Sequence, residues 1–262
     1  MMNRRYNMKR YWNQRAKVAK HHYNAVCVFK APLFFNYLME KLQLNCLSYA
    51  FKKIKKGVVV EKRRILVLEV GCGIGRWVNL VDKVIGQPVE YVGVDISTKI
   101  IVCARRRHPE KLFVICSVTH LPFKSNLFDI VFSVTVLHHI PYSMKEDAIK
   151  EVCRVTRSYV IAVEDICDKP PKNTLNWFPC PLNTWIRAFY KHGVKLINMR
   201  KHKFLQGKVH LLMRRRPFNN RLKRSCYMWW KVFSIDYCLG NNSPAHACFS
   251  GRKWTYEYLN KV

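Results

Sequence analysis

Short apolar runs alternate with longer segments of mixed polarity over residues 64–165. The apolar runs lack polar alternation, which is typical of parallel strands covered on both faces. They predict strands over residues 64–70, 90–96, 111–118, 128–136 and 158–165. The segments between them carry apolar residues at helical spacing and predict helices over residues 76–86, 97–109 and 143–156. Strands separated by helices in this way indicate a doubly wound, Rossmann-like α/β sheet.

Two flanks with a different pattern enclose this region. The first is basic and mainly helical, with a helix expected after Pro32. The second begins with a predicted helix over residues 183–193 and a predicted hairpin around Gly207. We therefore expect a lead or lid segment over 1–64, a domain over 65–216 with its core at 65–165, and a basic aromatic C-terminal extension over 217–262. A length of 262 residues suits one elaborated domain with appendages.

The first predicted strand ends in a turn with three alternating glycines, Gly71, Gly73 and Gly75. In doubly wound sheets, ligands bind beyond the carboxyl ends of the strands, at the switch point beside the first strand. A dinucleotide pyrophosphate needs positive potential there, whereas Glu69, two residues before the turn, repels phosphate and attracts a cation. S-adenosylmethionine carries a sulfonium and an ammonium and no phosphate. The charge therefore favours S-adenosylmethionine over a dinucleotide.

Asp95 ends the second predicted strand, 24 residues after Gly71. A carboxylate at this position can accept hydrogen bonds from both ribose hydroxyls, although dinucleotide-binding folds use the same device. The alternative is a helix amino cap, which is less natural two residues before Ser97. Asp95 therefore predicts a ribose site without separating the two cofactors.

Residues 65–165 resemble the class I methyltransferase domain, and specifically the methyltransferase type 11 group. The motifs "VLEVGCGIG", "VGVDIS", "LPFKSNLFDIVFSVTVLHHI" and "AIKEVCRV" follow in the order and spacing of that group. The resemblance implies an S-adenosylmethionine-dependent methyltransferase, with the glycine turn around the methionine moiety and Asp95 and Ile96 at the ribose and adenine. The candidate cofactor-binding residues are Glu69, Gly71, Cys72, Gly73, Gly75, Asp95, Ile96, Ser117, Val118 and Ser133.

Two departures from the type 11 pattern bear on activity. Ser117 and Val118 stand where the group has Asp-Ala before "LPF", and a neutral serine contact to adenine is weaker than a charged one. The glycine pair before the last core strand is replaced by the continuous run "RVTRSYVIAVED". These departures imply weaker cofactor binding, and a non-catalytic binding protein with the same fold is the alternative.

Candidate catalytic residues follow two of the predicted strands. His138 and His139 come just after the fourth strand, and Glu164 lies at the end of the fifth, where each could take a proton from an acceptor. Methyl transfer from a sulfonium relies on positioning, so a base is optional. The alternative is that the histidines cap a helix or satisfy loop backbone. The turn reads Ser133-Val-Thr135-Val, without the Asn/Asp-Pro-Pro-aromatic motif of adenine and glutamine amino methyltransferases.

Charge is unevenly distributed along the chain, which has 47 Lys/Arg, 16 Asp/Glu and a net charge of +31. Residues 1–64 hold 16 basic and 2 acidic residues, and residues 166–262 hold 19 and 3, whereas residues 65–165 are nearly neutral. Such flanks attract polyanions, so RNA and an anionic membrane surface are the candidate partners. Four aromatic residues in the C-terminal extension suit base stacking or an apolar cluster on the sheet edge: Trp229, Trp230, Trp254 and Tyr256. RNA is slightly favoured as the methyl acceptor, and a small molecule or lipid is the alternative.

The remaining features bear on compartment and metal. The sequence has no apolar run long enough for a transmembrane segment, and no apolar segment follows the basic start, so we expect a cytoplasmic protein. Eleven cysteines without a CxxC pair predict no metal site, although one C-terminal group leaves that alternative open: Cys226, Cys238, His246 and Cys248. Tyr11 and Trp12 resemble the aromatic lid segment of the type 11 group, and a surface-packing helix is the alternative. Nothing indicates the oligomeric state.

Overall fold

The computed structural model describes residues 6–18, 26–28, 31–58, 64–86, 89–169, 171, 174–201 and 208–215. The C-terminal extension, with its four aromatic residues and its cysteine group, lies outside the described residues. In the described part of the chain, no helix is long and apolar enough to cross a membrane. Within the same residues, no group of three His, Cys, Asp or Glu is placed to hold a metal ion.

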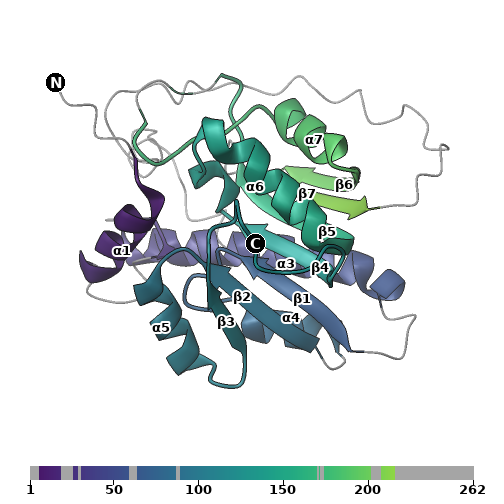
Figure 1. Cartoon of the computed structure of the whole chain (residues 1–262), viewed down its shortest axis with the longest axis horizontal. Coiled ribbons are helices and arrows are strands. Elements are labelled where there is room, and N and C mark those ends of the chain that lie inside the picture. Colours follow the sequence, from purple (N-terminus) through teal and green to yellow (C-terminus); the bar gives the residue numbers. More distant parts are fainter. Residues whose placement is uncertain are drawn as a thin grey trace, which may run out of the picture.

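Seven strands form one sheet in the order β3-β2-β1-β4-β5-β7-β6 (Figure 1). Their bounds are β1 Ile65–Val70, β2 Val89–Asp95, β3 Leu112–Ile115, β4 Phe128–Val134, β5 Thr156–Asp165, β6 Val194–Lys201 and β7 Lys208–Arg215. The first five strands are parallel, and β7 runs antiparallel to both β5 and β6. The chain moves outward from β1 to β3 and then returns across β1 to β4. This order confirms the predicted doubly wound sheet and places its switch point between β1 and β4.

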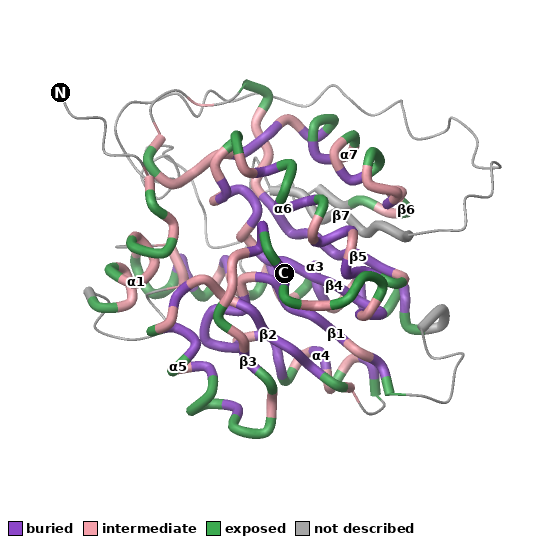
Figure 2. The backbone as a smooth tube through the Cα atoms, viewed as in Figure 1, coloured by how far each residue is buried: buried purple, intermediate pink, exposed green. Residues whose placement is uncertain are grey.

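Helices cover both faces of the sheet (Figure 1). Helices α3 (Leu33–Val58), α4 (Val78–Ile85) and α5 (Thr98–Arg107) pack on one face, and α6 (Tyr142–Val155) and α7 (Leu182–Lys191) pack on the other. The short α1 (Met8–Val18) contacts α5. Figure 2 shows the result, with the central strands buried and the outer surfaces of α1 and α5 largely exposed.

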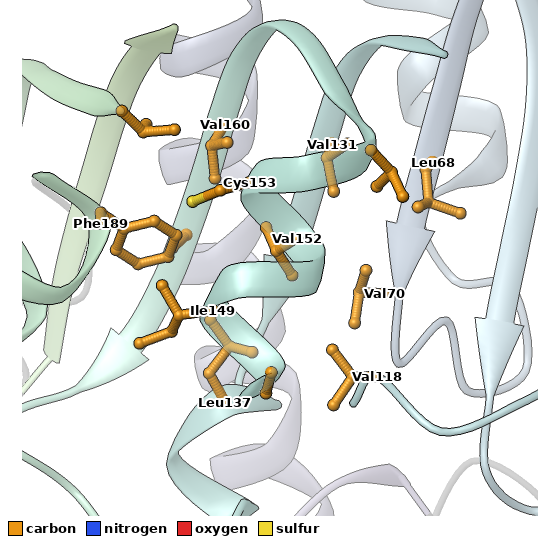
Figure 3. Close-up of a cluster of buried hydrophobic side chains, with 14 of the residues drawn as sticks. Leu68, Val70, Val118, Val131, Leu137, Ile149, Val152, Cys153, Val160 and Phe189 are labelled. Carbon is orange, nitrogen blue, oxygen red and sulfur yellow. The ribbon is translucent and has the colours of Figure 1, made fainter. Parts of the chain in front are cut away.

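Each face of the sheet has its own apolar core. Ile149 and Val152 of α6 and Phe189 of α7 lie against Val131 and Val160 of the central strands (Figure 3). On the opposite face, α3, α4 and α5 bury their apolar sides against the same strands, with residues such as Phe51, Trp77, Ile101 and Phe132. The uninterrupted apolar runs of the sequence therefore correspond to strands that contribute side chains to both cores.

Local signals set several of the element boundaries. Ser97 caps α5 by accepting a hydrogen bond from the Ile100 N–H at 3.3 Å. Gly86 ends α4 in the left-handed region, with φ of 70°. Helix α3 begins just after Pro32, as predicted, and continues through "KKIKKG" to Val58. The C-terminal boundary predicted at 216 lies one residue beyond the end of β7, the last described element.

Candidate functional site

A cavity of about 820 Å³, including its open mouth, lies at the carboxyl ends of the central strands. Eight of the ten predicted cofactor-binding residues line it: Glu69, Gly71, Cys72, Gly73, Asp95, Ile96, Ser117 and Val118. Val70 and Val118 line this cavity and also belong to the apolar core on the α6 side of the sheet (Figure 3). The other two predicted residues, Gly75 and Ser133, lie outside the lining.

The glycine turn fits its place because none of its three glycines tolerates a side chain. Gly71, Gly73 and Gly75 have φ of 68°, 55° and 73°, a region that favours glycine. A Cβ on Gly71 would lie 2.3 Å from a methyl of Val136, and one on Gly73 would lie 2.9 Å from a methyl of Val26. A Cβ on Gly75 would instead meet His108 and Phe113. The first two glycines therefore shape the cavity, whereas Gly75 allows close packing behind it.

Glu69 lies at the floor of the cavity and is almost completely buried. The hydroxyl of Tyr91 donates a hydrogen bond to its Oε2. Burial raises the pKa of the Glu69 carboxyl to about 8, although the Tyr91 hydrogen bond and the charge of Arg76 act in the opposite direction. The carboxyl is thus mostly protonated at neutral pH in the free protein, whereas the sequence analysis treats Glu69 as a charged acid.

Asp95 connects the glycine turn to the start of α5. Its Oδ2 accepts a hydrogen bond from the Gly73 N–H at 3.1 Å, and its Oδ1 accepts one from the Ser97 N–H at 2.9 Å. Ser97 itself supplies the side-chain cap of the helix. The backbone N–H of Ile96 also contacts this carboxyl. Since a carboxylate offers about four acceptor positions, Asp95 supports the turn and retains acceptor capacity.

The predicted adenine end of the cavity lies beyond β2 and β3, where Ile96, Ser117 and Val118 contribute to the lining. The Ser117 hydroxyl lies 2.8 Å from the Thr119 hydroxyl, which in turn lies 2.9 Å from Nδ1 of His120. If Thr119 donates to His120, Ser117 donates to Thr119 and keeps a lone pair toward the cavity. A serine in this arrangement can still accept a hydrogen bond from an amino group.

A strained turn after β4 precedes His138 and His139, which are adjacent in sequence but differ in their surroundings. Thr135 has φ of 57°, which is unusual for a β-branched residue. His139 lines the cavity, whereas His138 is buried behind it. Nδ1 of His138 lies 2.9 Å from Oε2 of Glu164, and the Ser133 hydroxyl donates to Oε1 of Glu164 at 2.9 Å. Ser133, His138 and Glu164 therefore form a buried cluster that supports the turn and does not line the cavity.

The carboxylate of this cluster is stabilised by its partners. Burial alone raises the pKa of Glu164, but the contact with His138 and the hydrogen bonds from Ser133 and nearby backbone outweigh it and lower the pKa. The backbone N–H of His138 also donates a hydrogen bond to Oε2 of Glu164 at 3.1 Å. Glu164 is therefore an anion whose acceptor positions are already taken within the fold.

His139 has the geometry of a base. Its Nδ1 is hydrogen-bonded to the backbone oxygen of Asn176, and a carbonyl can only accept, so the proton lies on Nδ1 and Nε2 carries a lone pair. Burial, together with the neighbouring His138, lowers the pKa of His139 well below its usual value. The ring of Trp12 packs edge-on against it, with 5.1 Å between centroids. His139 is thus a neutral imidazole with a fixed tautomer at the cavity.

Helix α1 forms one wall of the cavity through Met8 and Trp12. Asn13 anchors this helix, because its Oδ1 accepts a hydrogen bond from the Ser97 hydroxyl at 2.9 Å. The Tyr11 hydroxyl accepts one from the Asn176 side chain at 2.7 Å. The two residues predicted to form a lid thus differ, since Trp12 lines the cavity and Tyr11 holds the loop that orients His139.

Sequence reasoning missed three contributors to the site. Arg76 follows the glycine turn directly and lines the cavity. The sequence offered a signal for it, because Arg76 is the only charged residue of "GCGIGRW". Val26 closes over Gly73, and Tyr91 holds Glu69 from the neighbouring strand. No local pattern marks Val26 or Tyr91, because both contacts depend on the tertiary fold.

Several known proteins are similar to this chain in sequence. A family model described as a methyltransferase domain, type 11, matches residues 68–162. "Probable tRNA methyltransferase 9B" of Homo sapiens is 28% identical over 144 residues, which are 55% of this chain and 28% of the relative. "tRNA (carboxymethyluridine(34)-5-O)-methyltransferase" of Saccharomyces cerevisiae is 28% identical over 88 residues, which are 34% of this chain and 29% of the relative. The chain thus spans less than a third of the length of these relatives.

A solved structure supports the fold in the same way. Magnesium protoporphyrin IX methyltransferase from Synechocystis PCC 6803, with bound S-adenosylmethionine, superposes with a TM-score of 0.57. The match covers 82% of this chain and 100% of that chain at 16% identity. At this identity the likeness concerns the fold, which is the Rossmann-like architecture described above.

Proposed function

We propose that this chain, whose residues 68–162 match a methyltransferase domain model, is an S-adenosylmethionine-dependent methyltransferase with an RNA acceptor. The observation that carries the proposal is the cavity over the glycine turn, which combines the Glu69 and Asp95 carboxyls. Glu69 precedes the turn and Asp95 ends the neighbouring strand β2, and two acids at this cavity suit a cofactor with a sulfonium and an ammonium better than a pyrophosphate.

The residues of the cavity fit this cofactor. Gly71 and Gly73 let the backbone approach the ligand closely, because neither carries a side chain. Asp95 would hold the ribose hydroxyls, and Glu69 would attract the ammonium at the methionine end. Ile96 and Val118 would border the adenine, with Ser117 as acceptor for its amino group. When bound, the cofactor would supply a methyl group activated by its sulfonium: the acceptor atom would bond to the methyl carbon while the carbon–sulfur bond breaks and S-adenosylhomocysteine leaves.

The chain's own contribution to catalysis is orientation and proton removal. Nε2 of His139 carries a lone pair at the cavity, and Asn176 fixes the ring. We assign His139 as the base that takes a proton from an acceptor hydroxyl or amine. His138 and Glu164 then act as positioning residues, since their cluster is buried and holds the turn that presents His139.

Two observations support RNA as the acceptor. Two relatives named as tRNA methyltransferases, one of them as probable, are 28% identical to this chain over 144 and 88 residues. The net charge of +31 is concentrated in the flanks, and exposed bases such as Arg106, Arg107, Lys52 and Lys53 lie on α5 and α3. Phosphate neutralisation by such residues drives RNA binding and makes it sensitive to salt. An anionic membrane would attract the same surface, with a lipid or small molecule as acceptor.

The test is transfer of labelled methyl from S-adenosylmethionine to a cell extract that is then separated into RNA, lipid, protein and small-molecule pools. We expect label in RNA, a loss of about 100-fold or more for His139→Ala, and little change for the exposed control Asp147→Ala. Label confined to lipid or small molecules would replace the RNA acceptor. Cofactor binding without transfer to any pool would support a non-catalytic binding protein.

A further inference from the structure

The cavity brings an acid and a guanidinium to the two ends of the glycine turn. Glu69 precedes the turn, Arg76 follows it directly, and both line the cavity. They are close enough that the charge of Arg76 favours the ionised form of Glu69. The guanidinium of Arg76 lies over the Trp77 ring, 4.9 Å from the ring centroid. Nη1 of Arg76 lies 3.8 Å from Sγ of Cys27. The side chain is therefore held beside the turn.

This pair matches the charges of an α-amino acid group. Such a group carries an ammonium and a carboxylate, and it is recognised by one acceptor and one donor of opposite charge. Among the described residues that line the cavity, the carboxyl groups are Glu69 and Asp95, and Arg76 carries the permanent positive charge. His139 is neutral and is assigned above as the base for the methyl acceptor. With Asp95 at the ribose and Glu69 at the ammonium, the carboxylate has Arg76 as its charged partner.

We infer that Arg76 binds the α-carboxylate of the methionine moiety of S-adenosylmethionine. The inference rests on the proposed function and names a binding residue for the amino acid end of the cofactor. The planar fork of a guanidinium suits a carboxylate, because two parallel N–H groups face its two oxygens. The product keeps the same carboxylate after the methyl group has left. Arg76 therefore contributes equally to cofactor and product, whereas Glu69 favours the cofactor with its additional positive charge.

The test compares two ligands on three proteins. The ligands are S-adenosylmethionine and its decarboxylated form, which keeps the sulfonium and ammonium. The proteins are the full chain, Arg76→Met, and Arg64→Met as a control, because Arg64 is exposed at the opposite end of β1 and pairs with Glu90. Equilibrium dialysis with labelled ligand gives Kd, and the circular dichroism and unfolding midpoint of each variant verify its fold.

We expect the full chain and Arg64→Met to prefer S-adenosylmethionine by about 10- to 100-fold, the usual size of a charge-assisted contact. Arg76→Met should weaken the binding of S-adenosylmethionine by the same factor and change the Kd of the decarboxylated ligand by no more than about threefold. The preference is then abolished. Arg76→Lys should retain part of it, since charge remains without the fork. S-adenosylhomocysteine should lose affinity for Arg76→Met in parallel.

Two outcomes would overturn the assignment in different ways. If Arg76→Met retains the preference for the carboxylate, or weakens both ligands equally, Arg76 does not bind this group. If the full chain binds neither ligand, the proposed function fails and takes the inference with it. The wild-type measurement thus separates failure of the cofactor from failure of the residue.

Discussion

Protonation of Glu69 should couple cofactor binding to pH. Burial and the hydrogen bond from Tyr91 leave this carboxyl with a pKa of about 8 in the free protein. At pH 7 it is therefore about 90% protonated. A cofactor ammonium or sulfonium nearby favours the carboxylate and lowers the pKa, so binding releases a proton. By linkage, affinity then rises with pH.

The magnitude follows from the strength of a charged contact. A gain of about 1.5–3 kcal/mol lowers the pKa by about 1–2 units, to between about 6 and 7. Affinity should then rise by about 3- to 12-fold from pH 6 to pH 7.5, and binding at pH 7 should release about 0.4–0.8 proton. The range stops at pH 7.5 because the ligand's own amine has a pKa of about 8.

Isothermal titration calorimetry in two buffers of different ionisation enthalpy measures both quantities. Glu69→Gln keeps an oxygen for Tyr91 but cannot ionise, so its affinity should be lower and nearly independent of pH. Glu90→Gln removes an exposed acid from β2 and is the matched control. Proton uptake on binding, or an unchanged pH dependence in Glu69→Gln, would refute the role of Glu69.

Three further predictions concern stability and binding. Asp95→Ala should lower the free energy of unfolding by about 1–3 kcal/mol, because two backbone N–H groups lose their acceptor, and dialysis should show weaker cofactor binding; exposed Asp147→Ala should change neither. Gly71→Ala should cost more in denaturant unfolding than Gly86→Ala, since both have positive φ but only the first places a Cβ against Val136. Because the pKa of Glu69 is raised in the folded state, its ionisation should lower the free energy of unfolding by up to about 1.4 kcal/mol per pH unit as the pH rises between about 4.5 and 8. The free energy of unfolding of Glu69→Gln should fall less over this range.

The fold was predictable because its strands are continuous apolar runs. The five parallel strands and the helices between them follow the sequence pattern closely, since strands buried on both faces leave few polar positions. The antiparallel pairing of β6 and β7 also agrees with the predicted hairpin. The end of α3 was less visible, because Gly57 lies within a basic segment that continues the helix to Val58.

The candidate site was predictable where it depends on one local turn. Glu69, Gly71 and Gly73 lie together because they are neighbours in sequence, and Asp95 joins them because adjacent parallel strands end at the same edge. Spacing could not tell which side chains face the cavity. Ser133, for example, was predicted to bind the cofactor, but its hydroxyl donates a hydrogen bond to Glu164 beneath the turn.

The surroundings of His139 are formed by segments that are distant in sequence. Trp12 reaches His139 from α1, and Asn176 reaches it from the loop after β5. Their sequence separation from the histidine gives no periodic signal, and the contact exists only after the layers have packed. The assignment of His139 over its neighbour His138 thus follows from the structure, whereas the motif containing both was visible in the sequence.

The proposed activity of this chain is methyl transfer from S-adenosylmethionine to RNA. The most direct measurement incubates the full chain with labelled S-adenosylmethionine and total RNA, then counts label that resists protease and is released by ribonuclease, beside Asp95→Ala. We predict label in RNA for the full chain, falling by about tenfold or more in the variant. Label that persists in the variant, or label in lipid or small molecules with none in RNA, would contradict the account.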